Sequence, residues 1–143
     1  MSLPVIKLTD KRPQPVEVTA VTRPFWDGLS SGQFLVIACT QCERISFPPR
    51  VVCPRCLCRE LEWQPVSGRG ILYALTTVHK TPPVYGFSGP VNVVIVDLEE
   101  GVRLLTQLLP GTGTAALDSQ IQLVITEHPD GYHYAARSVS SPG

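Results

Sequence analysis

The chain has 143 residues, 43% of them hydrophobic and 17% charged, so its composition is that of a folded domain rather than a disordered polar segment. Twelve basic and twelve acidic residues cancel, which removes the overall positive charge that draws proteins to nucleic acids. The longest apolar runs fall far short of the ~18 residues that span a bilayer, and the first residues lack the pattern of a secretory signal. We therefore expect a cytoplasmic protein with no membrane partner.

The N-terminal region is expected to form an extended arm followed by one short helix. Residues 1–22 contain three prolines and no sustained hydrophobic period, which favours extended chain. The helix is predicted over 22–32, with Thr22 as its cap and a glycine at its end. Because a helix of about two turns is not stable alone, it must dock Phe25 and Trp26 against another surface.

From residue 34 onward the sequence has the pattern of short strands separated by turns. Strands are expected over 34–39, 61–66, 71–80, 91–98, 102–109, 121–125 and 132–138, with a loop over 82–90. The 91–98 strand is almost continuously apolar, as expected for a strand that is covered on both faces. Five short strands with a longer connection between the third and fourth indicate a small, partly open Greek-key barrel of the OB type. Either 61–66 or a bend within 71–80 is expected to supply the fifth strand, and a five- to six-stranded sandwich is the competing architecture.

The strongest motif is a pair of Cys-x-x-Cys sequences, Cys39 with Cys42 and Cys53 with Cys56, separated by ten residues. This spacing can place four thiolates tetrahedrally around one ion, and Zn²⁺ prefers such a set of soft ligands. A redox Cys-x-x-Cys normally stands alone at the start of a helix, so a redox role is disfavoured. The fifth cysteine, Cys58, is expected to be a free thiol. Four thiolate ligands leave no position for water, so the zinc is expected to be structural rather than catalytic.

The segment around these cysteines is rich in charge. Its arginines are opposed by three glutamates, so it is either a solvated, partly ion-paired surface or an anion-binding face for a phosphate-bearing ligand or nucleic acid. The arginines are Arg44, Arg50, Arg55 and Arg59, followed by Arg69. Between the two cysteine pairs, Phe47-Pro48-Pro49 is expected to form a rigid turn, with Phe47 packed on the same segment.

Patterns of catalytic residues are absent from the sequence. There is no Gly-x-Ser-x-Gly nucleophile motif, no Gly-x-Gly-x-x-Gly and no phosphate-binding Gly-x-x-x-x-Gly-Lys loop. The histidines His79, His128 and His133 are each expected at a surface or sheet edge rather than as a general base. We therefore do not expect the chain to be an enzyme by itself.

Four motifs follow one another along residues 23–126. They are Phe25-Trp-Asp-Gly-Leu-x-x-Gly32, the cysteine pairs with Phe47-Pro-Pro-Arg50 between them, Glu62-Trp63-x-x-Val66-Ser-Gly68-x-Gly70-x-x-Tyr73, and Leu98-Glu-Glu-Gly101-Val-Arg-Leu. In order and spacing they closely resemble the two-domain zinc-ribbon/OB-fold family, long known as a domain of unknown function and associated with acyl-CoA enzymes. The resemblance implies a mainly β fold: a helical arm at 1–36, a rubredoxin-like zinc ribbon at 37–60 and a five-stranded OB-fold barrel at 61–143.

The resemblance also implies a function. Members of this family are accessory subunits of thiolase-superfamily enzymes of the thiolase, acyltransferase or aldolase type, and others join MaoC-type enoyl-CoA hydratases. Their OB-fold domain has been proposed to hold or channel acyl-CoA. We therefore expect a non-catalytic subunit of a hetero-oligomeric acyl-CoA enzyme, with structural Zn²⁺ and with acyl-CoA as a ligand. A module that binds single-stranded nucleic acid is the alternative, because OB folds present stacking aromatics to such strands.

The residues expected to serve this function fall into three sets. Zinc is expected on Cys39, Cys42, Cys53 and Cys56. Contacts to the partner enzyme are expected from aromatic anchors in the arm and in the 82–90 loop, namely Phe25, Trp26, Tyr85 and Phe87. Contacts to the phosphate of acyl-CoA are expected from Arg50 and Arg55. No catalytic residue is expected.

Overall fold

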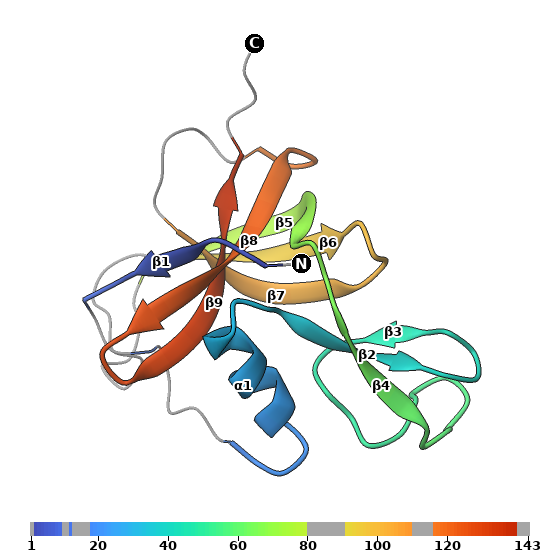
Figure 1. Cartoon of the computed structure of the whole chain (residues 1–143). Helices are drawn as coiled ribbons and strands as arrows, with labels where there is room; N and C mark the ends of the chain where they lie inside the picture. The colour runs from blue at the N-terminus through green and yellow to red at the C-terminus, as the bar shows by residue number, and fades with distance from the viewer. Residues whose placement is uncertain (1, 10–11, 13–17, 80–90, 110–115, 140–143) are drawn as a thin grey trace.

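The computed structural model describes residues 2–9, 12, 18–79, 91–109 and 116–139. These residues form one short helix and strands in two sheets (Figure 1). The elements are β1 (Val5–Lys7), α1 (Arg23–Ser30), β2 (Leu35–Cys39), β3 (Ile45–Ser46), β4 (Leu61–Pro65), β5 (Arg69–Val78), β6 (Val91–Leu98), β7 (Arg103–Leu108), β8 (Gln120–His128) and β9 (Gly131–Ser138). Within these ranges no helix has the length and apolar character needed to cross a membrane.

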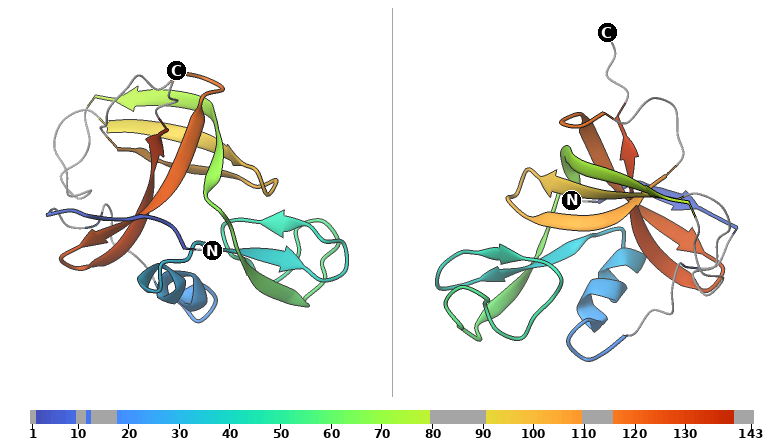
Figure 2. Two further views of the ribbon diagram at one scale, coloured as in Figure 1. Left: turned by 45° about the horizontal axis from the view of Figure 1, so that its top comes forward. Right: turned by 180° about the vertical axis from the view of Figure 1, so that it is seen from behind.

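The larger sheet closes into a five-stranded barrel (Figure 2). Its strand order is β1-β8-β5-β6-β7-β9, and a further pairing of β8 with β9 joins the two sides of the sheet. The barrel therefore consists of β5 to β9, with β1 added along β8. Its weakest seam is between β7 and β9, which meet in parallel through the single pair Leu108 and Ala136. This closed ring confirms the mainly β fold with an OB-type barrel and excludes a sandwich.

The fifth barrel strand is neither of the two alternatives expected from the sequence. β4 pairs antiparallel with β2, with Leu61 opposite Cys39, in the smaller sheet β3-β2-β4. The fifth strand is β9, which pairs with β8 over its whole length. β5 does bend, since its register against β6 shifts between Leu72 and Ala74, but it remains one strand. We call the smaller sheet and its connecting loops the ribbon.

The described part of the N-terminal arm is extended, as expected, and is attached to the barrel by strand pairing and by one buried side chain. β1 pairs in parallel with β8. Leu3 is 4% exposed, and its N–H donates to the carbonyl of Gly32 at 2.8 Å. Further along, the backbone N–H of Arg12 donates to Asp130 Oδ1 in the β8–β9 turn at 2.9 Å. A strand of three residues is too short to show a period, so the sequence carried no signal for it.

The predicted helix forms over Arg23–Ser30, but its N-terminus differs from the expected one. Thr22 occupies the cap position without a capping hydrogen bond from its side chain. Its Oγ1 instead accepts a hydrogen bond from the N–H of Thr19 at 2.9 Å, so the side chain stabilises the preceding turn. At the other end Gly32 has φ +82°, a left-handed conformation that ends the helix as predicted.

Four aromatic rings hold the helix, the ribbon and the barrel together. Phe25 of α1 packs edge-on against Phe34, which precedes β2, with ring centroids 5.1 Å apart. Both rings also lie against Phe47 and Tyr134, so the four form one aromatic cluster. This cluster supplies the docking surface that a two-turn helix needs. Phe47 thus packs in the joint between ribbon and barrel, where the sequence suggested a contact within the cysteine-rich segment.

Candidate functional site

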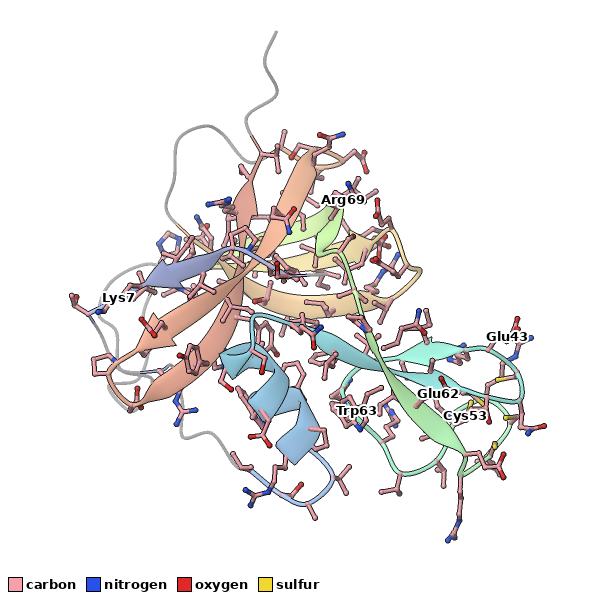
Figure 3. All side chains as sticks on the ribbon, in the orientation of Figure 1. Lys7, Glu43, Cys53, Glu62, Trp63 and Arg69 are labelled. Atoms are coloured by element: carbon pink, nitrogen blue, oxygen red, sulfur yellow. The ribbon has the colours of Figure 1, made fainter. Side chains whose placement is uncertain are left out.

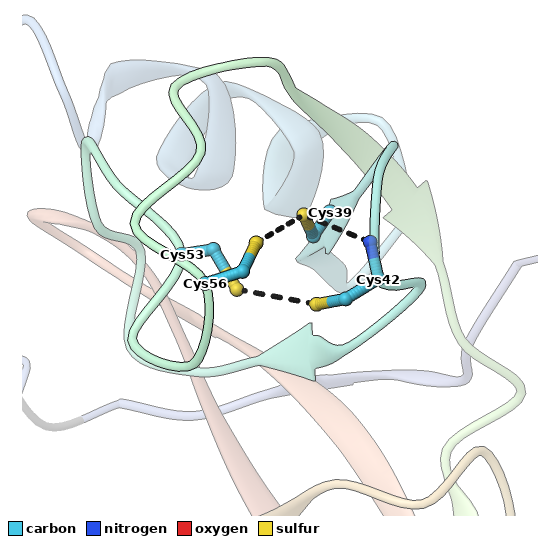
Figure 4. A group of neighbouring side chains, drawn as sticks. All are labelled: Cys39, Cys42, Cys53 and Cys56. Atoms are coloured by element: carbon cyan, nitrogen blue, oxygen red, sulfur yellow. Dashed lines mark hydrogen bonds between the residues drawn. The ribbon is translucent and has the colours of Figure 1, made fainter.

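Four cysteine side chains meet at the end of the ribbon that is remote from the barrel, where Figure 3 labels Cys53. Cys39 ends β2 and Cys42 lies in the turn that follows, whereas Cys53 and Cys56 come from the loop between β3 and β4. All four Sγ atoms lie within 4.8 Å of one another, and the Cys39–Cys56 and Cys42–Cys53 pairs are each 3.5 Å apart (Figure 4). A tetrahedral zinc site with Zn–S bonds of ~2.3 Å separates its sulfurs by about 3.8 Å, so the donor set fits this ion.

The two Cys-x-x-Cys turns have the same backbone geometry. The N–H of Glu43 donates to the carbonyl of Cys39 at 3.1 Å, and the N–H of Leu57 donates to that of Cys53 at 2.9 Å. The residue after each pair is left-handed, with φ 64° at Glu43 and 63° at Leu57. An N–H inside each turn also donates to the first sulfur at 3.4 Å. Each short motif therefore curls around its first sulfur and directs two sulfurs to one point.

Hydrogen bonds within these turns favour the thiolate of the first cysteine in each pair. The backbone N–H of Cys42 lowers the pKa of Cys39 to about 6. A backbone hydrogen bond from Cys56 likewise lowers the pKa of Cys53. At Cys56 a backbone hydrogen bond from Cys58 lowers the pKa, but desolvation and the three neighbouring sulfurs outweigh it and raise the pKa to about 12. Four sulfurs this close resist full ionisation unless a cation lies among them.

Cys58 lies outside the four-sulfur group, as expected for the fifth cysteine. Its Sγ accepts a hydrogen bond from the N–H of Glu60 at 3.2 Å. Its backbone carbonyl accepts one from the N–H of Cys53 at 2.8 Å. Cys58 therefore supports the second cysteine turn through its backbone.

The two arginines expected to contact a phosphate have different surroundings. Arg50 lines a cavity of about 460 Å³ between the ribbon and the β6–β7 turn of the barrel. Arg44 lines the same cavity from the ribbon, and Arg103 lines it from β7. Arg55 is exposed on the second cysteine turn, where its N–H donates to Cys53 Sγ at 3.4 Å. Arg50 therefore borders a cavity that Arg55 does not reach.

The four aromatic residues expected at a partner interface are not equivalent. Phe25 is 2% exposed in the aromatic cluster, so its ring belongs to the core of this chain and is not on the surface. Trp26 is half-buried, with its ring centroid 5.0 Å from that of Phe25 and 5.7 Å from that of His133. A partner at this helix would therefore meet Trp26 rather than Phe25. Tyr85 and Phe87 lie outside the described residues.

Large apolar side chains lie exposed on the outside of the barrel, and none of them was expected from the sequence to contact a partner enzyme, although Tyr73 was considered as a ring that could stack on bases. Ile71 and Tyr73 of β5 and Leu105 of β7 are 40%, 49% and 61% exposed. Ile95 of β6 lies directly opposite Leu105. We call Ile71, Tyr73, Ile95 and Leu105 the outer apolar face. The sequence feature that could have indicated this face is the apolar 91–98 run, because such a run is typical of a strand covered on both faces. The described residues cover only its inner face.

Two of the three histidines, His128 and His133, are more enclosed than expected. His128 is 9% exposed, and its Nε2 lies 2.7 Å from Thr126 Oγ1. His133 is half-buried and stacks on the ring of Tyr134 at 4.8 Å, and burial lowers its pKa. The surface prediction holds for His79 and is wrong for His128, which is buried on the same face of β8 as Thr126.

Curated relatives of this chain carry three kinds of name. The "DUF35 domain-containing scaffold protein" of Methanocaldococcus jannaschii is 34% identical over 51% of this chain and 52% of its own length. The "Benzoylsuccinyl-CoA thiolase subunit BbsA" of Thauera aromatica is 30% identical over 61% of this chain and 59% of its own. The "Probable enoyl-CoA hydratase alpha subunit" of Thermomonospora curvata is 35% identical over 68% of this chain and 30% of its own. The chain spans about half the length of the scaffold proteins it matches.

Among solved structures, the "Ltp2-ChsH2(DUF35) aldolase" has the same fold, with a TM-score of 0.75 and 22% identity over 87% of this chain and 98% of that one. Two family models match in chain order and together span residues 26–125. Residues 26–62 match the rubredoxin-like zinc ribbon domain of ChsH2, and residues 63–125 match its C-terminal OB-fold domain. The four clustered cysteines lie in the first of these ranges, and barrel strands β5, β6 and β7 with most of β8 lie in the second, whereas β9 follows it. The chain therefore belongs to the zinc-ribbon/OB-fold family of ChsH2 and the DUF35 scaffold proteins.

Proposed function

We propose that this chain is a non-catalytic accessory subunit of a thiolase-superfamily enzyme, of the thiolase, acyltransferase or aldolase type, and that it helps to bind or channel acyl-CoA. The names of similar proteins support this role: a scaffold protein, a thiolase subunit and an aldolase. The proposed division of the chain is an arm at 1–36, a zinc ribbon at 37–60 and an OB-fold domain at 61–143, except that β2 and β4 both lie in the sheet of the ribbon.

The outer apolar face carries this proposal. An antiparallel barrel that stands alone normally turns polar side chains to water. Here Tyr73 and Leu105 are 49% and 61% exposed, and Ile95 lies across from Leu105 on the strand between them. Exposed apolar side chains on three neighbouring strands are a feature of protein interfaces, and Tyr is among the residues that dominate binding energy when buried there. A catalytic subunit would supply the missing cover.

We further propose that Cys39, Cys42, Cys53 and Cys56 hold one structural zinc ion. Their sulfurs lie within 4.8 Å of one another, and the lowered pKa values of Cys39 and Cys53 favour the ligating thiolates. With all four positions taken by sulfur, the ion would have no site for a substrate or water. Its role is to hold the ribbon rigid beside the barrel.

Acyl-CoA carries phosphate groups, and arginine is the side chain best suited to bind them. Arg50 and Arg55 are the candidate contacts on the ribbon. The cavity beside Arg50 supports the first of them. For Arg55, the only support among the described residues is its exposed position.

A MaoC-type enoyl-CoA hydratase is the second candidate partner, favoured by the 35% identity to the Thermomonospora curvata protein. Binding of single-stranded nucleic acid has less support. The ring of Tyr134 is enclosed in the aromatic cluster, and Arg103 covers one face of Tyr73 at 3.7 Å, so these rings are poorly placed to stack on bases. The net charge of zero also argues against nucleic-acid binding.

Affinity purification of the tagged chain from its native host, followed by mass spectrometry, tests the proposed function. We expect a stoichiometric thiolase-, acyltransferase- or aldolase-like chain to co-purify. A hydratase chain instead would support the second candidate. Recovery of the bare protein, or of nucleic acid alone, would contradict both.

The Leu105→Asp variant is expected to weaken the purified complex by about thirtyfold or more, because a buried hot-spot side chain contributes ~2 kcal/mol or more and a carboxylate resists burial. The affinity of the reconstituted complex can be measured by biolayer interferometry. Leu117→Asp is the matched control, since Leu117 is 62% exposed but lies before β8, away from the outer apolar face. Normal binding by Leu105→Asp, or the same loss in both variants, would exclude this face as the interface.

A further inference from the structure

A cavity of about 460 Å³ lies between the ribbon and the barrel. We propose that it binds a nucleotide-type phosphate monoester, with the phosphate on three arginines and the organic part on the apolar lining. The arginines are Arg44 and Arg50 from the ribbon and Arg103 from the barrel. CoA carries such a phosphate, so the site would give the proposed function a defined ligand contact. The proposal rests on that function only for the identity of the natural ligand.

The cavity has an excess of positive charge. Neither Arg44 nor Arg50 forms an ion pair with any residue that the structure describes. Asp97 is the one carboxylate among the described lining residues, and Arg103 engages both of its oxygens, at 2.6 Å and 3.1 Å. Two arginines therefore border the cavity without a counter-charge. A phosphate dianion would supply it through charge-assisted hydrogen bonds.

Arg103 is positioned before any ligand arrives. Its Nε and Nη2 donate to Asp97, and its guanidinium carbon lies 3.7 Å from the centre of the Tyr73 ring. Its Nη1 lies outside the pair with Asp97, so this is the nitrogen through which Arg103 would donate to a ligand. A planar donor that is already fixed loses little freedom on binding. Arg103 would thus contact the phosphate from the barrel, and Arg44 and Arg50 would contact it from the ribbon.

The size of the cavity is that of a site for an organic phosphate, and part of its lining is apolar. Small-molecule sites measure ~300–1,000 Å³, and this cavity of about 460 Å³ falls in that range. Its apolar lining lies beside the arginines and consists of Ile45, Phe47, Pro54 and Val102. An inorganic phosphate would leave this lining in contact with water, whereas a nucleoside would cover it.

Isothermal titration calorimetry of the zinc-loaded full chain tests the site, with AMP as the probe. We expect AMP to bind, adenosine to show no binding, and inorganic phosphate to bind about tenfold or more weakly than AMP. In Arg44→Ala and Arg50→Ala the affinity for AMP should fall by about tenfold or more, since each loses a charge-assisted hydrogen bond. Arg59→Ala is the matched control, because Arg59 is an exposed ribbon arginine outside the cavity.

Failure of AMP to bind, or unchanged binding by Arg50→Ala, overturns the site. Equal affinity for AMP and inorganic phosphate overturns the role of the apolar lining. Zinc content and thermal unfolding establish that each variant is folded. Titration with CoA separates the site from the proposed function: AMP binding without CoA binding keeps the cavity site and contradicts the acyl-CoA role. A stable partner complex in a chain that binds no AMP keeps the accessory function and rejects the site.

Discussion

Replacing Cys53 with serine is expected to abolish zinc binding and to unfold the ribbon loops while the barrel stays folded. Between residues 40 and 60 only Ser46 and Cys53 are buried, so these loops have no apolar core of their own. Structural zinc supplies ~10–16 kcal/mol of apparent folding free energy in modules of this kind, which is more than a single buried side chain provides. The buried residues of the main core lie outside this segment, and only Ile45 and Phe47 pack against them from it, so the barrel should stay folded with reduced stability.

Metal analysis of the purified protein and hydrogen exchange of the ribbon amides measure this effect. Cys58→Ser is the matched control, because Cys58 lies in the same loop but outside the four-sulfur group, and it should keep one zinc per chain. Acid should act in the same direction as Cys53→Ser, since protons compete with the metal for the thiolates. Zinc retained by Cys53→Ser, or lost equally from Cys58→Ser, would rule out the assigned ligands.

The features that were predicted well from the sequence depend only on residues that are close together in the chain. The cysteine spacing indicated two turns, and the structure brings their four sulfurs together. Alternating apolar residues predicted β7 and β8, and a glycine predicted the end of α1 at Gly32. Each of these depends on a hydrogen bond or a period within one element. Whether the sulfurs hold zinc is still a prediction.

The features that were not predicted from the sequence depend on contacts between segments that are far apart in the chain. β4 has the pattern of a barrel strand, but it pairs with β2. The residues of 61–66 alone do not show which strand they pair with. Phe25 was expected at an interface, yet it is buried because Phe34, Phe47 and Tyr134 converge on it from three other segments. A local pattern shows that a side chain needs cover and does not show what provides it.

The same limit applies to the candidate anion site. Arg50 was identified within a charged segment, but Arg103 was not, because only the docking of the β6–β7 turn against the ribbon brings the two to one cavity. Arg55 was expected, together with Arg50, to contact the phosphate of acyl-CoA. In the structure it lies on the second cysteine turn instead.

Phe34→Ala is expected to lower the free energy of unfolding by about 3–5 kcal/mol. Phe34 is completely buried, and its ring centroid lies 5.1 Å from that of Phe25, 5.2 Å from that of Phe47 and 5.1 Å from that of Tyr134. Truncation removes three aromatic contacts and leaves a cavity whose walls belong to three different parts of the fold. Domains of this size are stable by only ~5–15 kcal/mol, so the loss should be visible directly in urea unfolding.

Tyr73→Ala is the matched control for Phe34→Ala, because it removes an aromatic ring that is 49% exposed and contacts Arg103. Its expected cost is below about 1 kcal/mol, the range of an exposed cation–π contact. Hydrogen exchange adds a second test. If the aromatic cluster is the joint between α1, ribbon and barrel, Phe34→Ala should lower protection first in α1, because the Phe25 ring of the helix packs directly on Phe34. Equal costs for the two variants, or full protection of α1 in Phe34→Ala, would show that the helix is held by something other than this cluster.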